Sequence, residues 1–275
     1  MECSVQIGGS YKARTMDHAN TQIVIATAAV IFVILYKIFS ARAGREIYIR
    51  RIAGLNALEE AIGRATEMGR PMLFHPGIGG ITDIATLAAL GVLSYVARCG
   101  AKMGSRLIFV TCVPVLVPIA EDIIKQAYQA EGQSELFKAE DVRYLAAQGD
   151  QLALGANDLM REEKTASHFF FGTYDYTSLL LTEPGQHTGA MQIAGCRDYF
   201  QVPFFIASCD YTIICEELYA ASAYLTREPT MLGSLIGQDY AKIAVLVIII
   251  LGTIAVSLGP NFIDYFEQFI GGPYK

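Results

Sequence analysis

The sequence is poor in charge. Only 17% of its 275 residues are charged and 53% are hydrophobic, whereas globular domains average about 25% charged residues. Because disordered chains lack apolar residues, the mean hydropathy of +0.35 excludes intrinsic disorder. The net charge is −6 and no basic face is dense enough to bind many phosphates, so nucleic acid is not an expected partner.

The common signatures of catalysis are also missing. The sequence has no phosphate-loop GKS or GKT, no HExxH and no GxSxG. Its six cysteines show no CxxC pair and no metal-ligand spacing, so we expect small buried hydrophobic residues in a reducing compartment, not a metal site. Without these motifs, the sequence assigns no catalytic residue, metal ligand or cofactor. Their absence favours a protein that is not an enzyme.

Two long apolar runs account for the excess hydrophobicity. Residues 23–39 contain a single charge, Lys37, and residues 243–258 contain none. About 20 residues of helix cross the roughly 30 Å apolar core of a bilayer. We therefore expect one transmembrane helix over residues 22–40 and a helix over 231–258 that leads into a second span. A buried core helix is the alternative for both runs. A cleaved signal peptide is a further alternative for the first, but its long polar lead and basic exit favour a retained anchor.

Basic residues near the spans predict their orientation. Arg42, Arg45, Arg50 and Arg51 follow the first run, and lysine and arginine favour the cytoplasmic side. We expect a two-pass protein of the cell (inner) membrane. Its N-terminal tail, residues 1–21, and its C-terminus would be extracytoplasmic, and residues 44–228 would form a cytoplasmic domain.

The C-terminal tail, residues 260–275, carries a short amphipathic pattern. Phe262, Tyr265, Phe266 and Phe269 recur at helical spacing, with polar residues between them. Such an aromatic stripe suits the headgroup region of a membrane, so membrane lipid is an expected partner. Packing of the stripe on another subunit remains an alternative.

Between the spans, short apolar runs alternate with amphipathic ones. This alternation predicts βαβ units and a Rossmann-like α/β domain with a mostly parallel sheet. An alternative has residues 84–97 and 107–120 as third and fourth spans. Strands are expected at residues 72–75, 106–112, 142–145, 168–173, 190–194 and 204–208, and helices at 56–68, 82–98, 118–130, 151–164 and 211–225.

A glycine-rich turn follows the first expected strand, with Thr82 as the expected cap of the next helix. Backbone N–H groups at a helix N-terminus can bind an anion, although the glycine spacing departs from a dinucleotide fingerprint and Asp83 would repel phosphate. A purely structural tight turn is the alternative. The candidate ligand-binding residues are His75, Gly77, Gly79, Gly80, Thr82, Asp83 and Asp210.

A catalytic version of this site uses residues expected beyond the carboxyl ends of parallel strands. His75 and Asp210 would then form a base and its orienting acid, and Cys112 or Cys209 would be the nucleophile. Nothing in the spacing requires these residues to meet.

Residues 44–71 (GREIYIRRIAGLNALEEAIGRATEMGRP) and 216–237 (EELYAASAYLTREPTMLGSLIG) resemble a prokaryotic membrane-anchored domain family of unknown function. The resemblance covers about residues 44–258. It implies that the arginine-rich segment, the first helix and the final helix with its span form one unit. It implies no catalytic residue, cofactor or substrate.

These observations favour a membrane-anchored structural or scaffold subunit. It would present a cytoplasmic α/β interaction domain within a homo-oligomer or a larger complex of membrane subunits. One alternative is a ligand- or nucleotide-binding sensor or enzyme that uses the turn at residues 76–83. Another is an accessory subunit of a transporter or respiratory complex.

Overall fold

A computed structural model describes residues 21–42 and 53–258. The chain divides into two compact units, one formed by Met1–Arg45 with Gly233–Lys275 and the other by Glu46–Leu232. The expected tail at residues 1–20, the amphipathic segment at 260–275 and three of the four arginines after the first apolar run lie outside the described residues.

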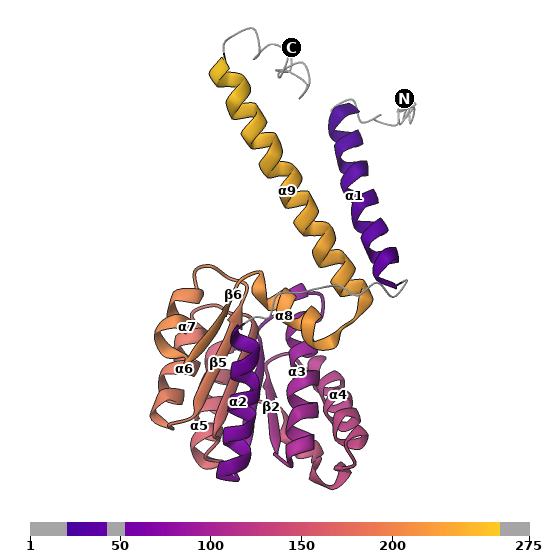
Figure 1. Cartoon of the computed structure of the whole chain (residues 1–275). Helices are drawn as coiled ribbons and strands as arrows, with labels where there is room; N and C mark the ends of the chain where they lie inside the picture. The colour runs from indigo at the N-terminus through magenta and orange to yellow at the C-terminus, as the bar shows by residue number, and fades with distance from the viewer. Residues whose placement is uncertain (1–20, 43–52, 259–275) are drawn as a thin grey trace, which may run out of the picture. The chain divides into compact units, whose positions relative to one another are not determined.

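The larger unit is an α/β domain built on one six-stranded sheet (Figure 1). All five neighbouring strand pairs are parallel, in the order β3-β2-β1-β4-β5-β6. This confirms the predicted α/β class and its parallel sheet. The strands are β1 (Met72–Gly77), β2 (Leu107–Thr111), β3 (Val142–Tyr144), β4 (Ser167–Thr173), β5 (Met191–Cys196) and β6 (Tyr211–Ile214).

Helices cover both faces of this sheet (Figure 1). The first four helices named below supply one hydrophobic layer, and the other three supply the second. They are α2 (Ala53–Met68), α3 (Ile84–Met103), α4 (Leu116–Ala130) and α8 (Glu217–Thr226), and then α5 (Gly149–Glu162), α6 (Thr177–His187) and α7 (Val202–Ser208). Two single-turn 3₁₀ helices, Ser134–Leu136 and Ala139–Asp141, precede β3.

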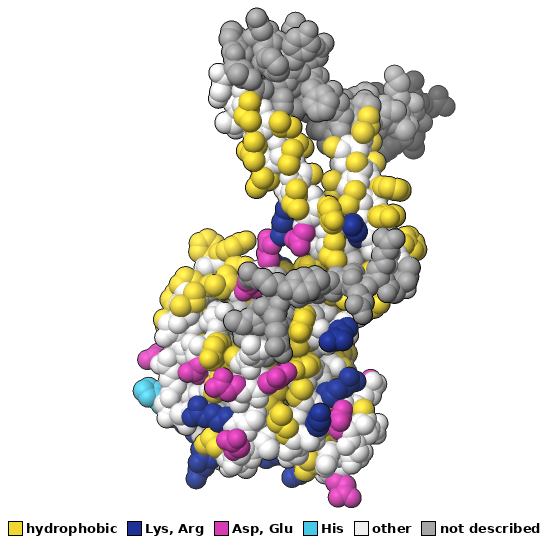
Figure 2. Space-filling view, viewed as in Figure 1, with side chains coloured by type: hydrophobic (Ala, Val, Ile, Leu, Met, Phe, Trp, Pro, Cys, Tyr) yellow, Lys and Arg dark blue, Asp and Glu magenta, His cyan; other side chains and the backbone are white. Residues whose placement is uncertain are grey.

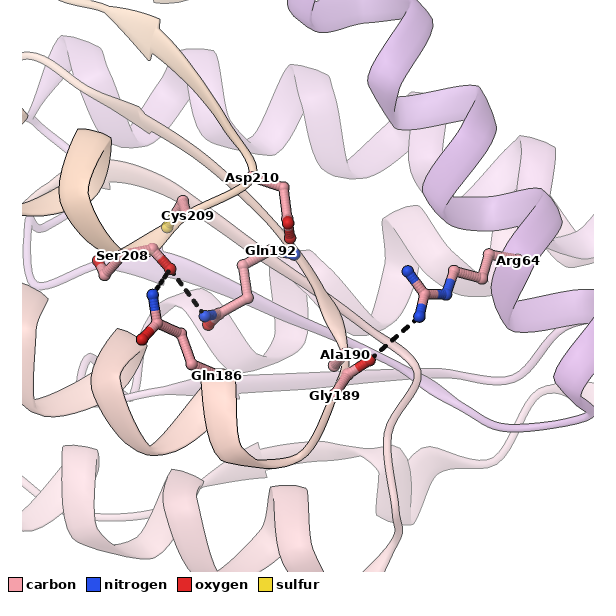
Figure 3. A pocket seen from close by; sticks show the side chains of 8 residues that line it. All are labelled: Arg64, Gln186, Gly189, Ala190, Gln192, Ser208, Cys209 and Asp210. Atoms are coloured by element: carbon pink, nitrogen blue, oxygen red, sulfur yellow. Dashed lines mark hydrogen bonds between the residues drawn. The ribbon is translucent and has the colours of Figure 1, made fainter.

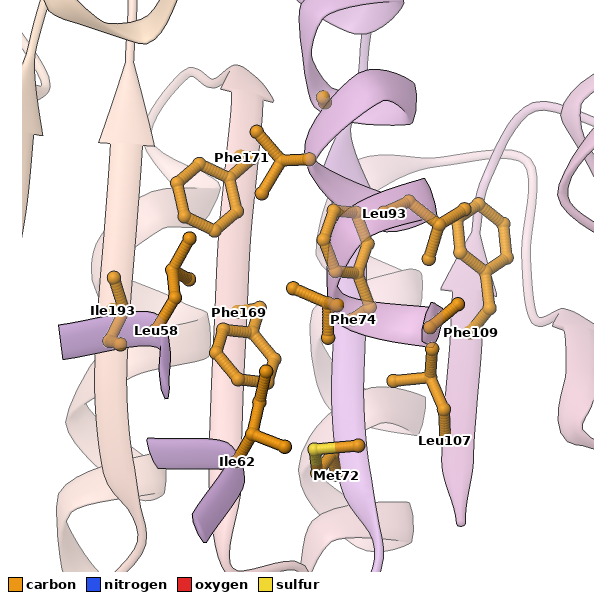
Figure 4. Close-up of a cluster of buried hydrophobic side chains, with 14 of the residues drawn as sticks. Leu58, Ile62, Met72, Phe74, Leu93, Leu107, Phe109, Phe169, Phe171 and Ile193 are labelled. Atoms are coloured by element: carbon orange, nitrogen blue, oxygen red, sulfur yellow. The ribbon is translucent and has the colours of Figure 1, made fainter. Parts of the chain in front are cut away.

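The core explains why the strands read as continuous apolar runs. Successive side chains of a strand point to opposite faces, so Phe74 of β1 enters the α2–α3 layer and the adjacent Leu73 enters the α5–α6 layer. On the first face, the ring of Phe74 lies 6.2 Å from that of Phe109 and 5.9 Å from that of Phe171 (Figure 4). A sheet covered on both faces needs apolar side chains at every position.

The third long apolar helix is α3, and it belongs to this domain. By length and composition it could cross a membrane, but 61% of its most apolar stretch is buried inside the structure. Residues 107–120, expected as a helix in the four-span alternative, instead form β2, a turn and the start of α4. The hairpin required by that alternative is therefore absent from the described residues.

Near the end of the domain the expected strand at residues 204–208 is wrong, and the expected helix at 211–225 begins too early. Residues 204–208 belong to α7, and residues 211–214 form β6 before α8 begins at Glu217. Pro203 fits the first turn of α7, where a missing N–H costs no helical hydrogen bond. Val202, Phe205 and Ser208 are buried at three-residue spacing, which is the pattern of a helix with one covered face. The helix α6 was not predicted.

The smaller unit contains α1 (Thr21–Arg42) and most of α9 (Pro229–Leu258). Two glycines of α9 bring these helices together. A Cβ at Gly233 would lie 2.6 Å from the Cα of Ile38, and one at Gly237 would lie 2.9 Å from the Cα of Ile34. Side chains larger than hydrogen would force the backbones apart, as in the small-residue contacts of membrane helices.

Candidate functional site

The strand order places a topological switch between β1 and β4, because the chain continues to β2 and β3 on one side and to β5 and β6 on the other. Doubly wound α/β folds bind ligands beyond the carboxyl ends of the strands at this point. The glycine-rich turn at residues 76–83 leaves β1 there, beside the end of β4. The structure thus puts the predicted turn at the expected edge.

The glycines in this turn let β1 and β4 approach closely. Gly77 has a left-handed φ of 81°, and a Cβ there would lie 2.7 Å from the backbone nitrogen of Thr173. Across the switch, Gly172 has φ 131°, and any Cβ would collide with the carbonyl oxygen of Pro76. The N–H of Ile78 then donates to the carbonyl of Thr173 over 2.9 Å. Backbone approach alone accounts for these two glycines.

Asp83 occupies the N-terminus of α3. Its Oδ1 accepts a hydrogen bond from the N–H of Ala85 at 3.2 Å, so Asp83 caps the helix, not Thr82 as expected. The hydroxyl of Thr173 donates to its Oδ2, and Arg197 Nη1 lies 3.2 Å from its Oδ1. Gly79 packs against this carboxylate. The anion position at this helix end is therefore filled by the protein's own carboxylate, which opposes a phosphate there.

His75 is buried at the end of β1 and bonded to the other side of the switch. Its Nδ1 lies 2.8 Å from the phenolic oxygen of Tyr174 and 3.1 Å from the N–H of Gly77. Its Nε2 is buried and has no hydrogen-bond partner among the described residues. Burial lowers the pKa of His75 to about 3, so the imidazole is neutral at physiological pH and a weak proton acceptor.

Asp210 lies at the opposite edge of the sheet. It stands before β6 and pairs with the start of β5: its Oδ2 accepts from the N–H of Gln192 at 2.7 Å. The structure therefore does not bring Asp210 to His75, because the expected strand that would have carried it there is α7. Burial also raises the pKa of the Cys112 and Cys209 thiols, which opposes their use as nucleophiles.

Two pockets of the described domain lie at this opposite edge, where the strands begin (the amino edge), and no sequence motif points to either. One, of about 320 Å³, is polar, and most of its polar groups already bond to one another (Figure 3). The other, of about 370 Å³, is rich in cations. The first is lined by Arg64, Gln186, Gly189, Ala190, Gln192, Ser208, Cys209 and Asp210, and the second by Arg70, Met160, Arg161, Lys164, His187 and Thr188.

No group of three or more histidine, cysteine, aspartate or glutamate side chains within the described ranges could hold a metal ion. Of the predicted site residues, the structure gathers His75, the turn glycines, Thr82 and Asp83, and separates Asp210 from them.

Fold and site define an α/β protein with a six-stranded parallel sheet of doubly wound order, and within residues 21–42 and 53–258 three helices are apolar enough to span a membrane. Residues 11–266 match the family described as a domain of unknown function (DUF6754), so the chain belongs to that uncharacterised family. This confirms the resemblance to a domain family of unknown function. No curated protein and no solved structure matches the chain.

Proposed function

We propose that the protein is a two-pass membrane protein whose α/β domain serves as an interaction module in an oligomer or a larger membrane complex. The observation that carries the proposal is the exposed apolar surface of α1 and α9. Only 6% and 11% of their apolar windows are buried, against 61% for α3. At about 25 cal/mol per Å² of apolar surface, two such helices would be unstable in water, whereas lipid removes the cost.

The filled helix end at the switch supports an interaction role over nucleotide binding. A dinucleotide would place its pyrophosphate where Asp83 caps α3. To bind there, a phosphate would have to displace this carboxylate from its hydrogen bonds with Ala85 and Thr173 and from Arg197.

The proposed topology places both termini outside the cell membrane and the α/β domain in the cytoplasm, because arginines follow the first span. Labelling of intact cells with a membrane-impermeant maleimide tests it. We expect Cys3 to react in the parent protein and the exposed position of a Ser134→Cys variant lacking Cys3 to stay unlabelled. The reverse pattern would refute the orientation.

Extraction in mild detergent tests the interaction role. We expect the full chain to run as an oligomer or to copurify with other membrane subunits, among them those of a transporter or respiratory complex if it is an accessory subunit. A monodisperse monomer without partners would count against this proposal while leaving the membrane anchoring intact.

Ligand binding at the switch is a second candidate function, and the unpartnered Nε2 of the buried His75 favours it. Thermal midpoints of the full chain with and without nucleotides and inorganic phosphate test it. Ligand-dependent stabilisation should disappear in Gly79→Val, whose side chain would meet Asp83, and persist in Gly80→Ala, where nothing lies within 4 Å of the new methyl group. No stabilisation of the parent protein would remove this candidate.

A further inference from the structure

Every strand of the sheet ends beside an exposed apolar side chain at its carboxyl end. These side chains lie in the segment after each strand or at its last residue, and they come from parts of the chain far apart in sequence. They are Ile81 after β1, Val115 after β2, Tyr144 of β3, Tyr176 after β4, Phe200 after β5 and Ile214 of β6. We name this set the carboxyl-edge patch.

The patch is most exposed after β5. Phe200 is 87% exposed and its neighbour Tyr199 is 73% exposed. Figure 2 shows hydrophobic side chains gathered at the end of the domain where β6 terminates, above α7. Single exposed apolar residues are ordinary on a protein surface, but one at the carboxyl end of each of the six strands favours a covering along this edge.

The opposite edge of the sheet has a different character. Arg70 precedes β1, Lys164 precedes β4 and His187 precedes β5, and all three line the cation-rich pocket. The two edges therefore differ: the carboxyl edge carries the strongly exposed Tyr199 and Phe200, and the amino edge carries this cation-rich pocket beside Met68, Met103 and Asp210.

The first and last helices of the domain, α2 and α8, both begin at its carboxyl side. Gly54, in the first turn of α2, packs against Ile213 near the end of β6. A Cβ added at Gly54 would lie 2.6 Å from Cγ1 of Ile213. Thr226 of α8 lies against Gly91 in the first half of α3, which begins at the carboxyl edge.

Two of the acidic side chains at this edge are held by groups of the domain itself. Asp83 pairs with Arg197, and Asp175 accepts a hydrogen bond from the N–H of Thr177. The remaining composition, tyrosine and phenylalanine beside isoleucine and valine, is that of side chains that settle at the boundary between headgroups and acyl chains.

We propose that the carboxyl-edge patch rests in the headgroup region of the bilayer that α1 and α9 cross, with Tyr199 and Phe200 reaching deepest. The occupant is the lipid surface itself. This inference rests on the proposed membrane anchoring. It orients the amino edge of the domain, with its cation-rich pocket, toward the cytoplasm. It also places the switch between β1 and β4 against lipid, where a soluble cofactor would have poor access.

The chain contains no tryptophan, so a single introduced tryptophan reports its own surroundings. We would place one at Phe200, at Ile248 in the middle of α9, or at Met68, the last residue of α2 at the amino edge. All three side chains are exposed, so the larger ring is tolerated. Each full-length variant goes into nanodiscs of phosphatidylcholine with or without bromine atoms near the top of the acyl chains.

Bromine should quench the tryptophan of Phe200→Trp and of Ile248→Trp, and leave Met68→Trp as bright as in unbrominated lipid. Quenching at position 248 without quenching at 200 would overturn the docking and leave the anchoring intact. If that unquenched tryptophan were also shielded from aqueous acrylamide, the patch would be covered by protein instead. No quenching at 248 would overturn the anchoring, and equal quenching at 68 and 200 would overturn the polarity of the domain.

Discussion

Acid should destabilise the α/β domain through its two buried histidines. His75 and His168 are fully buried, and burial lowers their pKa values to about 3 and about 4. In the unfolded chain both titrate near 6.5. Below about pH 6.5 the histidines of the unfolded chain therefore bind protons that those of the folded domain do not bind, and the free energy of unfolding falls as the pH falls. The stability is fully present above 6.5 and is lost down to the folded pKa values.

The size of this effect follows from the distance below 6.5. The pH of 5 lies about 1.5 units below 6.5, and each unit lowers the free energy of unfolding by about 1.36 kcal/mol per histidine. Each histidine therefore removes about 2 kcal/mol of stability at pH 5, and the two together remove about 4 kcal/mol. That is a large part of the roughly 5–15 kcal/mol by which domains are stable. Replacement of one histidine by a residue that does not titrate should halve the loss.

Urea unfolding of the full chain in nanodiscs, monitored by tyrosine fluorescence, measures this pH-dependent loss of stability. His75→Phe keeps a ring beside Tyr174, whose hydroxyl still has the carbonyl of residue 75 as acceptor. Between about pH 7.5 and pH 5 we expect the parent protein to lose about 4 kcal/mol and this variant about 2 kcal/mol. Equal losses in the two proteins would refute the assignment of His75 as a buried neutral group.

Three further substitutions concern helix packing and the buried carboxylate of Asp141. Gly63→Ala should stabilise the domain by about 0.5–1 kcal/mol, because Gly63 lies inside α2 with nothing within 4 Å of the added methyl group. Gly91→Ala should destabilise it, since the methyl group would meet the hydroxyl of Ser222; urea midpoints that move in the same direction would contradict this contrast. Asp141→Ala should cost about 2–3 kcal/mol, because it leaves the guanidinium of Arg106, now 2.5 Å from Asp141, with one carboxylate fewer; a thermal midpoint unchanged from the parent would exclude a stabilising ion pair.

The apolar patterns of the sequence were sufficient for the class of fold. Strands such as residues 107–111, covered on both faces, must be apolar throughout. The glycine turn after β1 was also recognisable, because glycine is needed where φ is positive, as at Gly77. The two long apolar helices follow from length and composition alone.

The last part of the domain needed tertiary information. The run at residues 204–208 suits either a strand or a short helix, and burial of Val202, Phe205 and Ser208 at three-residue spacing decides for α7. The displaced strand, β6, is short and lies at the sheet edge, where one neighbour fixes it. That change moves Asp210 from the carboxyl edge to the amino edge and separates it from His75.

The sequence by itself determined an α/β domain between two apolar helices, because hydrophobic periodicity and run length are local properties of a chain. Only the tertiary structure decided the strand order, the partners of Asp83 and the gathering of six distant apolar residues at one edge. These depend on which strands pair across long stretches of sequence, and local pattern carries no record of that pairing.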